Sequence, residues 1–265
     1  MKLHTPEFYQ CAIKHACPDV VEVAEPNVCG TIAQVYLAYT PKNTVVCRFN
    51  NRDIIARNHV ASNLLTLADI PVPVTHTHAY LDSWFETYNY CDKPTMFDYV
   101  QSGASESDVL RMYQSVFHIQ REISRISPND FMPRSGKNLS DVFVMTNQQK
   151  WRPGVVRGLG WIYKMFSQTG TPRLLHTDLQ PKNILINDDM GVEKLIDLDA
   201  ISVCNENFAM FKMLVAYPFN NGEQIMECYE DIMGRKLNRT VLNLGVDLFH
   251  KMKVQGILNH KLLVR

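Results

Sequence analysis

The sequence lacks an excess of charge of either sign, since 27 lysines and arginines balance 27 aspartates and glutamates. Such a chain has no overall field to attract nucleic acid or an anionic membrane, so any charged site must be local. It also lacks a long hydrophobic run. His4 and Glu7 interrupt the N-terminal region before an export signal could form, and the most apolar later stretch, residues 208–219, is short and contains Lys212. These absences predict a cytoplasmic protein with no nucleic-acid or membrane partner.

Paired cysteines are also absent. The seven cysteines occur singly, their number is odd, and none forms a Cys-x-x-Cys pair. We therefore expect no zinc site and no disulfide framework, and interpret the thiols as small, reduced side chains of a cytosolic protein. Internal repeats and low-complexity tracts are missing too. The composition, 46% hydrophobic and 20% charged over 265 residues, is that of an ordinary globular protein with one domain or two packed lobes.

The first 90 residues predict a small sheet with helices. Thr5, followed by a proline and an acid, is typical of a helix start, and a short helix to about residue 16 is expected. A second, main helix is predicted over residues 53–68, whose apolar side chains share one face. Apolar runs separated by turn residues predict strands. They cover residues 20–24, 31–39, 44–49, 74–81 and 83–90, which we expect to form a five-stranded antiparallel sheet.

The remaining chain, residues 91–265, has a mostly helical character. A connector at residues 91–94 contains proline and small polar residues, and Ser105 begins a pattern typical of a capping box. An apolar stripe follows at Val109, Tyr113, Val116, Phe117 and Ile123, which predicts a core helix. Three glycines weaken the helical pattern of residues 151–166, and helices are expected again beyond Asn205. We therefore predict two lobes, residues 1–90 and 91–265.

The most informative stretch covers residues 174–199. Within it, residues 184–187 and 193–196 are strand-like, and the Asp-Asp-Met-Gly sequence between them favours a turn, so a hairpin is expected. A hairpin brings the start of one strand beside the end of the other, which makes Asn183 and Asp197 neighbours. An amide oxygen and a carboxylate are hard ligands that Mg²⁺ accepts while it keeps water and substrate phosphates. The pattern therefore predicts half of a phosphate site.

A second carboxylate precedes this pair. Asp178 lies on a loop stiffened by Pro181, close along the chain to Asn183, where it can accept the proton of a hydroxyl. Phosphoryl transfer needs mainly positioning and charge neutralisation, so one carboxylate for the acceptor and two magnesium ligands form a minimal set. The alternative is that these side chains only cap local backbone groups and that Asp197 simply ends a strand.

Two segments, HTDLQPKNILIN at residues 176–187 and IDLDA at residues 196–200, carry a family resemblance. They resemble the catalytic loop and metal-binding motif of aminoglycoside phosphotransferases and choline kinase-like proteins, which are related to protein kinases. The resemblance is strong over residues 174–200 and weaker elsewhere. It implies an α+β, bilobal protein kinase-like fold, with a small N-terminal antiparallel β-sheet lobe that binds nucleotide and a larger, mostly helical lobe that carries catalysis and substrate binding.

The resemblance also implies roles for single residues. By it, Asp178 is the catalytic aspartate, Asn183 and Asp197 are the magnesium ligands, and His176 supports the catalytic loop. Asp199 stands where relatives often carry another acid, and its role stays open between the site and a structural hydrogen bond.

In the first lobe, three segments are similar to nucleotide-binding elements of this family. Gly30 and Thr31 match its nucleotide loop, although an ordinary hairpin turn would look the same. Arg48 is a basic residue in an apolar strand, where the family places a lysine or arginine toward the nucleotide; the alternative is an edge-strand arginine that reaches solvent. Thr87 and Tyr88 match the hinge that binds a purine edge. The alternative is that Tyr88, with Tyr90, packs between the lobes.

One departure stands out on the predicted main helix. The family's helix usually offers a glutamate to pair with the basic residue of the strand. Here the corresponding position holds Asn58 or His59, and neither reproduces that ion pair. The departure leaves the orientation of Arg48 open, and with it the possibility of a slow, degenerate or differently organised site.

Together these features predict an ATP- and Mg²⁺-dependent kinase that phosphorylates a small-molecule hydroxyl. The acceptor stays open between amino alcohols such as choline, aminoglycosides and sugars, and the oligomeric state stays open as well. An aromatic cage for a quaternary ammonium could use Trp151, Trp161, Tyr163, Tyr217 and Phe219, although aromatic residues in helical segments are more often core residues. A cationic acceptor could meet Glu223, Glu227, Glu230 and Asp231, although a charged helical face is usually only solvated. The alternatives are a non-catalytic nucleotide-binding scaffold and an enzyme that transfers a nucleotidyl group. A protein acceptor is not expected, because the sequence has no recognisable activation segment after Asp197 and predicts a direct passage into helices.

Overall fold

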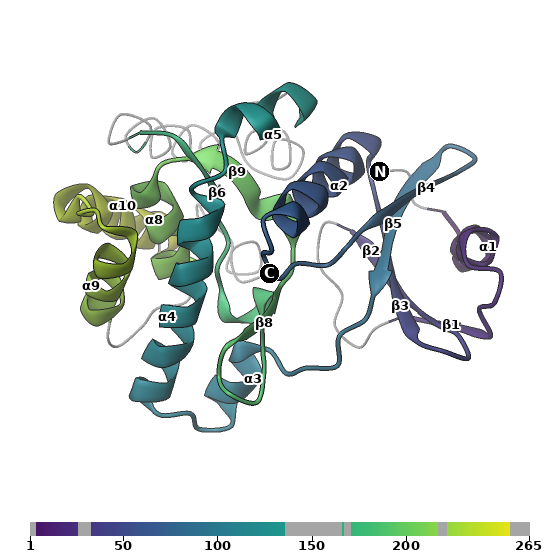
Figure 1. Ribbon diagram of the computed structural model, residues 1–265, viewed down its shortest axis with the longest axis horizontal. Helices are drawn as coiled ribbons and strands as arrows, with labels where there is room; N and C mark the ends of the chain where they lie inside the picture. The colour runs from purple at the N-terminus through teal and green to yellow at the C-terminus, as the bar shows by residue number, and fades with distance from the viewer. Residues whose placement is uncertain (1–3, 26–32, 136–165, 167–170, 217–221, 255–265) are drawn as a thin grey trace. The chain divides into compact units, whose positions relative to one another are not determined.

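The structure, a computed structural model, describes residues 4–25, 33–135, 166, 171–216 and 222–254 (Figure 1). The chain divides into two compact units, Met1–Asp92 and Lys93–Arg265, which are described separately below. The first unit holds a five-stranded antiparallel sheet, as predicted, in the order β1-β2-β3-β5-β4. Its strands are β1 (Glu22–Ala24), β2 (Gln34–Tyr39), β3 (Thr44–Asn50), β4 (His76–Tyr80) and β5 (Ser83–Asn89).

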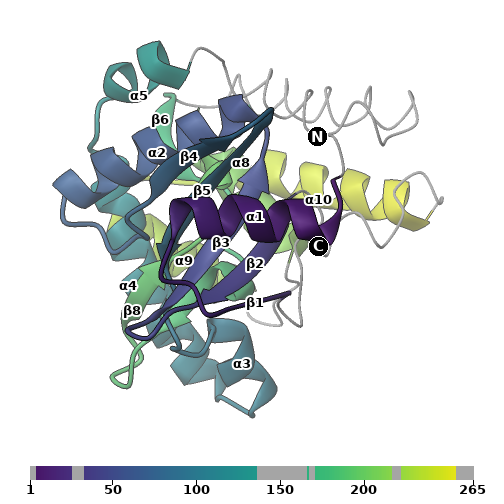
Figure 2. The ribbon, with the colours of Figure 1, turned by 90° about the vertical axis from the view of Figure 1, so that its right-hand side faces the viewer.

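A helix covers each face of this sheet (Figures 1 and 2). Helix α1 (Pro6–Ala16) packs Tyr9, Ala12 and Ile13 against side chains of β2, β3 and β5 and forms an apolar core with them. Helix α2 (Arg52–Leu67) lies against β4 and β5 on the opposite face. Because side chains alternate along a strand, Cys47 of β3 faces α1, whereas Arg48 faces α2. The sheet thereby separates an apolar face from a face that can carry polar chemistry.

In the second unit, helices surround two short ribbons. Its described helices are α3 (Met96–Gln101), α4 (Glu106–Ile123), α5 (Pro128–Ser135), α8 (Glu206–Ala216), α9 (Gly222–Met233) and α10 (Arg239–Val254). The predicted capping box at Ser105 is confirmed, because Ser105 and Asp108 exchange hydrogen bonds at the start of α4. The predicted apolar stripe of α4 is buried and packs against α9. Among the described helices, none has the length and apolar character needed to cross a membrane.

The two ribbons carry the motif. One pairs β7 (Ile184–Ile186) with β8 (Val192–Leu195), which is the predicted hairpin. The other pairs β6 (Arg173–His176) with β9 (Ile201–Cys204). The expectation that the chain passes directly from Asp197 into helices is therefore wrong. Asp197 is followed by the short 3-10 helix Leu198–Ala200 and then by β9, and the next α-helix, α8, begins only at Glu206. Local patterns do not reveal β9, because its hydrogen-bonding partner β6 lies far away in the sequence.

Candidate active site

The hairpin of β7 and β8 brings Asn183 and Asp197 to one end of the ribbon. Ile184 pairs with Leu195, and the backbone N–H of Ile196 donates to the carbonyl of Asn183 at 2.9 Å. The turn that joins the strands is held by Asn187, whose side chain accepts from the N–H of Gly191 at 2.8 Å. Local turn chemistry thus determines which residues meet at the open end of the ribbon.

Asp178 is anchored beside Asn183. Its Oδ2 accepts hydrogen bonds from the side-chain amides of Gln180, at 2.9 Å, and Asn183, at 3.0 Å. The same Asn183 amide also donates to the Asp178 carbonyl at 2.9 Å. Because the Nδ2 atom of Asn183 is engaged in this way, its carbonyl oxygen is the atom left to bind a cation. The structure therefore brings Asp178 and Asn183 together, with the Asp178 carboxylate 20% exposed.

Asp197 has a left-handed backbone, with φ 63° and ψ 59°. This conformation is uncommon for residues other than glycine, although aspartate tolerates it, and such positions concentrate at functional sites. The side chain is exposed. Within the described ranges, no group of three or more histidine, cysteine, aspartate or glutamate side chains could hold a metal by itself. A cation here would rely on one carboxylate, one amide oxygen and oxygens from substrate and water, a donor set that suits Mg²⁺.

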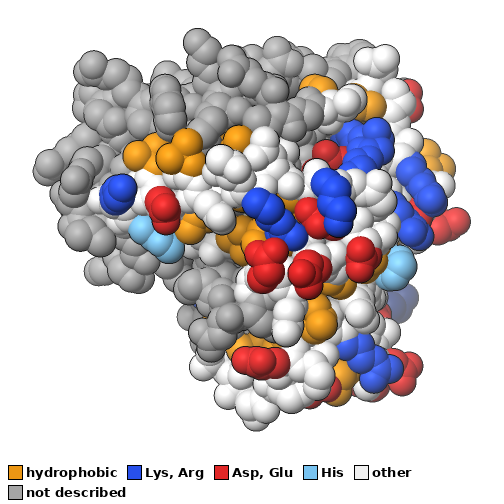
Figure 3. Space-filling view, turned by 90° about the vertical axis from the view of Figure 1, so that its left-hand side faces the viewer, with side chains coloured by type: hydrophobic (Ala, Val, Ile, Leu, Met, Phe, Trp, Pro, Cys, Tyr) orange, Lys and Arg blue, Asp and Glu red, His pale blue; other side chains and the backbone are white. Residues whose placement is uncertain are grey.

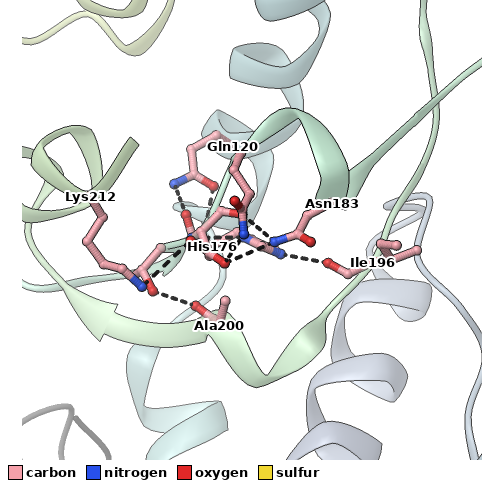
Figure 4. Close-up of polar contacts among 9 residues, drawn as sticks. Gln120, His176, Asn183, Ile196, Ala200 and Lys212 are labelled. Carbon is pink, nitrogen blue, oxygen red and sulfur yellow. Dashed lines mark hydrogen bonds and ion pairs between the residues drawn. The ribbon is translucent and has the colours of Figure 1, made fainter. Parts of the chain in front are cut away.

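His176 holds the loop together, as the resemblance implies. Its buried ring accepts the N–H of Asp178 at Nδ1, at 3.2 Å, and its Nε2 lies 3.1 Å from the carbonyl of Ile196 (Figure 4). These partners require a neutral ring with the proton on Nε2. Burial lowers the pKa of His176, which favours the same neutral form. The histidine therefore links the loop that carries Asp178 to the end of β8.

Gln120 of α4 was missed by the sequence analysis. Its amide donates to the carbonyl of His176 and accepts from the N–H of His176, each at 3.1 Å (Figure 4). The only signal in the sequence is a glutamine on the apolar side of a core helix, where it is fully buried. This double hydrogen bond connects the start of the loop that carries Asp178 to the core helix α4.

Lys212 of α8 was noted in the sequence only as an interruption of an apolar stretch. In the structure its Nζ lies 3.8 Å from Oδ1 of Asp178. Figure 4 shows the Lys212 side chain extending from α8 toward His176 and Ala200. The site thus contains a positively charged side chain that the motif does not predict.

In the first unit, Arg48 forms a buried ion pair. It stands opposite Glu86 in the β3–β5 register, with Nη1 of Arg48 2.9 Å from Oε1 of Glu86 and side-chain exposures of 11% and 3%. Asn58 of α2 donates to the same glutamate oxygen at 3.1 Å. The alternative of an edge-strand arginine is wrong, because β3 lies between β2 and β5. The acid expected from the helix is therefore supplied by the neighbouring strand, while His59 bonds the Thr75 carbonyl instead.

The other predicted nucleotide contacts stay predictions. Gly30 and Thr31 lie outside the described residues. Thr87 is buried in β5, with its hydroxyl 2.9 Å from Nε2 of His78, so its side chain is engaged within the sheet. Tyr88, the next residue along β5, is half-buried.

The structure tests some of the residues suggested for binding the acceptor and not others. All five aromatic residues lie outside the described residues. Of the four acids, Glu230 is buried and accepts from the N–H of Leu237 at 2.7 Å, so its use for a cationic acceptor was wrong. Glu223 pairs with Arg239, and Glu227 and Asp231 line a groove of about 500 Å³ between α4 and α9. On the face of the second unit where α9 and α10 lie, positively and negatively charged side chains are interspersed among the described residues (Figure 3).

Sheet, helices and site together define the class of the fold: α+β, bilobal and protein kinase-like, as predicted, of the kind found in aminoglycoside phosphotransferases. No family profile and no curated protein sequence matches the chain. Solved structures do match it.

The chain is similar to an aminoglycoside 2'-phosphotransferase-IIIa in complex with GDP, with a TM-score of 0.68 and 15% identity over 98% of this chain and 95% of that one. It is also similar to a spectinomycin phosphotransferase bound to ADP and spectinomycin, with a TM-score of 0.62 and 13% identity over 98% and 91% of the two chains. A macrolide 2'-phosphotransferase from Brachybacterium faecium matches with a TM-score of 0.58 and 15% identity over 95% and 91%. At these identities the likeness defines the fold.

Proposed function

We propose that the chain is an ATP-dependent small-molecule kinase that transfers the γ-phosphate to an alcohol acceptor. The observation that carries this proposal is the cluster in which Asn183 meets Asp178 through its side-chain amide and Asp197 through the hairpin. Similar structures hold GDP, ADP with spectinomycin, or ATP with streptomycin, which supports a nucleoside triphosphate and a small hydroxyl compound as substrates. The acceptor class stays open between amino alcohols, aminoglycosides and sugar-like compounds.

In this proposal Asp178 accepts the proton of the acceptor hydroxyl. The bond between the acceptor oxygen and the γ-phosphorus forms while the bond to the bridging oxygen of ADP breaks. Asn183 and Asp197 would hold Mg²⁺, which supplies neutralisation of phosphate charge when bound. Arg48, oriented by Glu86, would bind a phosphate of the nucleotide. The alternative of a non-catalytic scaffold rested on the missing helix glutamate and on the thin glycine loop at Gly30. The Arg48–Glu86 pair supplies an acid in place of the first, whereas Gly30 lies outside the described residues.

The test is an ATP-consumption screen over choline, ethanolamine, aminoglycosides, sugars and small amino alcohols, with the product identified by mass spectrometry. A hit should carry one added phosphate and depend on magnesium. Asp178→Ala and Asp197→Ala should each lower kcat by at least about 100-fold, the loss typical of a positioned acid–base or charge-stabilising group.

Asp189→Ala, in the exposed turn of the same hairpin, is the matched control and should retain activity. Unchanged turnover in both active-site variants, or a product that carries a nucleotide, would defeat the proposal.

A further inference from the structure

Lys212 is an isolated charge among apolar residues. Its neighbours along α8, Phe211 and Met213, are buried at 4% and 2% exposure, whereas the lysine side chain is 29% exposed. A partly buried ammonium is costly unless it meets an anion. The anionic group that it faces is the carboxylate of Asp178.

The contact between them is too long for a hydrogen bond. At 3.8 Å, the separation of Nζ and Oδ1 exceeds the usual range for charge-assisted pairs by almost an ångström. An ion pair this loose and this exposed contributes little to folding stability. Stability alone therefore does not explain a lysine at this place.

The two oxygens of Asp178 have different surroundings. Oδ2 already accepts the amides of Gln180 and Asn183, whereas the described contact of Oδ1 is the loose one with Lys212. Oδ1 is thus the oxygen that can receive an acceptor hydroxyl. An acceptor bound there has the ammonium of Lys212 beside its reacting oxygen.

We infer that Lys212 is a catalytic residue that binds the phosphoryl group during its transfer; this rests on the proposed function. As the acceptor oxygen attacks the γ-phosphorus, its proton passes to Oδ1 of Asp178 and ADP departs with the electron pair of the broken bond. Lys212 keeps its proton throughout. Its charge stabilises the phosphoryl oxygens. The lysine of the HTDLQPKN loop, Lys182, is engaged elsewhere, because its ammonium lies over the Phe97 ring.

The test compares Lys212→Met and Lys212→Arg with the wild-type chain. With ATP and an acceptor from the screen, Lys212→Met should lower kcat about 100-fold, as expected for loss of one group that stabilises transition-state charge, while KM for ATP changes by less than about threefold. Lys212→Arg should have a kcat about tenfold higher than Lys212→Met, because its guanidinium restores the positive charge although its geometry differs from that of an ammonium. Lys251→Met, at an exposed position of α10, is the control and should match the wild type.

A binding measurement separates contact with the phosphoryl group from mere orientation of Asp178. Calorimetry should show that Lys212→Met weakens binding of magnesium, ADP and aluminium fluoride, which mimic the transferring group, but leaves binding of magnesium and ADP unchanged. If the wild type is active and Lys212→Met is equally active, or if the two chains bind the mimic with equal affinity, the role of Lys212 is overturned while the proposed function stands. A wild type that neither turns over nor binds the mimic overturns the proposed function and this inference with it.

Discussion

At the scale of residues, the Arg48–Glu86 pair stands where the family resemblance implied a pair between Arg48 and a helix glutamate. The two residues are directly opposite in adjacent strands, so the pairing depends on the register of β3 and β5 rather than on the position of α2. Asn58 contributes a neutral donor in place of a carboxylate. The missing helix glutamate is thus not a missing ion pair, because strand β5 provides the acid that faces Arg48.

Glu86→Gln should destabilise the chain because it leaves a buried arginine without its countercharge. Breaking a buried pair from one side costs about 3 kcal/mol, and urea unfolding of the full chain would measure it. Adding Arg48→Met to Glu86→Gln should recover part of the lost unfolding free energy, since the buried guanidinium charge is then removed.

Glu193→Gln, a partly exposed position in β8, serves as the control. A Glu86→Gln loss below about 0.5 kcal/mol, the range of ordinary surface changes, would contradict the importance assigned to this pair.

At the scale of elements, the loop that carries Asp178 depends on α4 as much as on its own ribbon. Gln120 satisfies both backbone groups of His176, and the His176 ring then fixes the Asp178 backbone and the end of β8. The carboxylate to which we assign catalysis is therefore held by a chain of hydrogen bonds that begins in the helical core.

Gln120→Leu should leave the N–H and the carbonyl of His176 without these partners inside the protein. Each unsatisfied buried group costs about 1–3 kcal/mol, so a loss of about 2 kcal/mol or more is expected, together with a lower kcat. Gln114→Leu makes the same change at an exposed position of the same helix and should be nearly neutral. Equal stability of the two variants would show that Gln120 does not hold the loop.

At the scale of the whole molecule, binding of nucleotide and metal should stabilise the folded chain. A ligand at a hundredfold excess over its Kd adds about 2.7 kcal/mol, which corresponds to a rise in Tm of about 5 °C or more. The added stability from magnesium in the presence of ADP should vanish in Asp197→Ala and persist in Asp189→Ala. Differential scanning fluorimetry measures both, and a magnesium effect that survives in Asp197→Ala would exclude this residue as a ligand.

Much of the architecture follows from local patterns. Strand alternation, proline-rich breaks and the Ser105 capping box predicted the five-stranded sheet and the core helix α4. The β6–β9 ribbon escaped prediction because its two strands are short and the whole β7–β8 hairpin separates them in the sequence. The same reason hid the partner of Arg48, which lies 38 residues away.

The sequence by itself determined the core of the candidate site. Asp178, Asn183 and Asp197 lie close along the chain, and a short hairpin brings its own ends together wherever the rest of the protein packs. Only the tertiary structure decided which groups surround this core. Gln120 and Lys212 come from helices distant in sequence, and their side chains reach the loop because of how those helices pack, which no local pattern encodes.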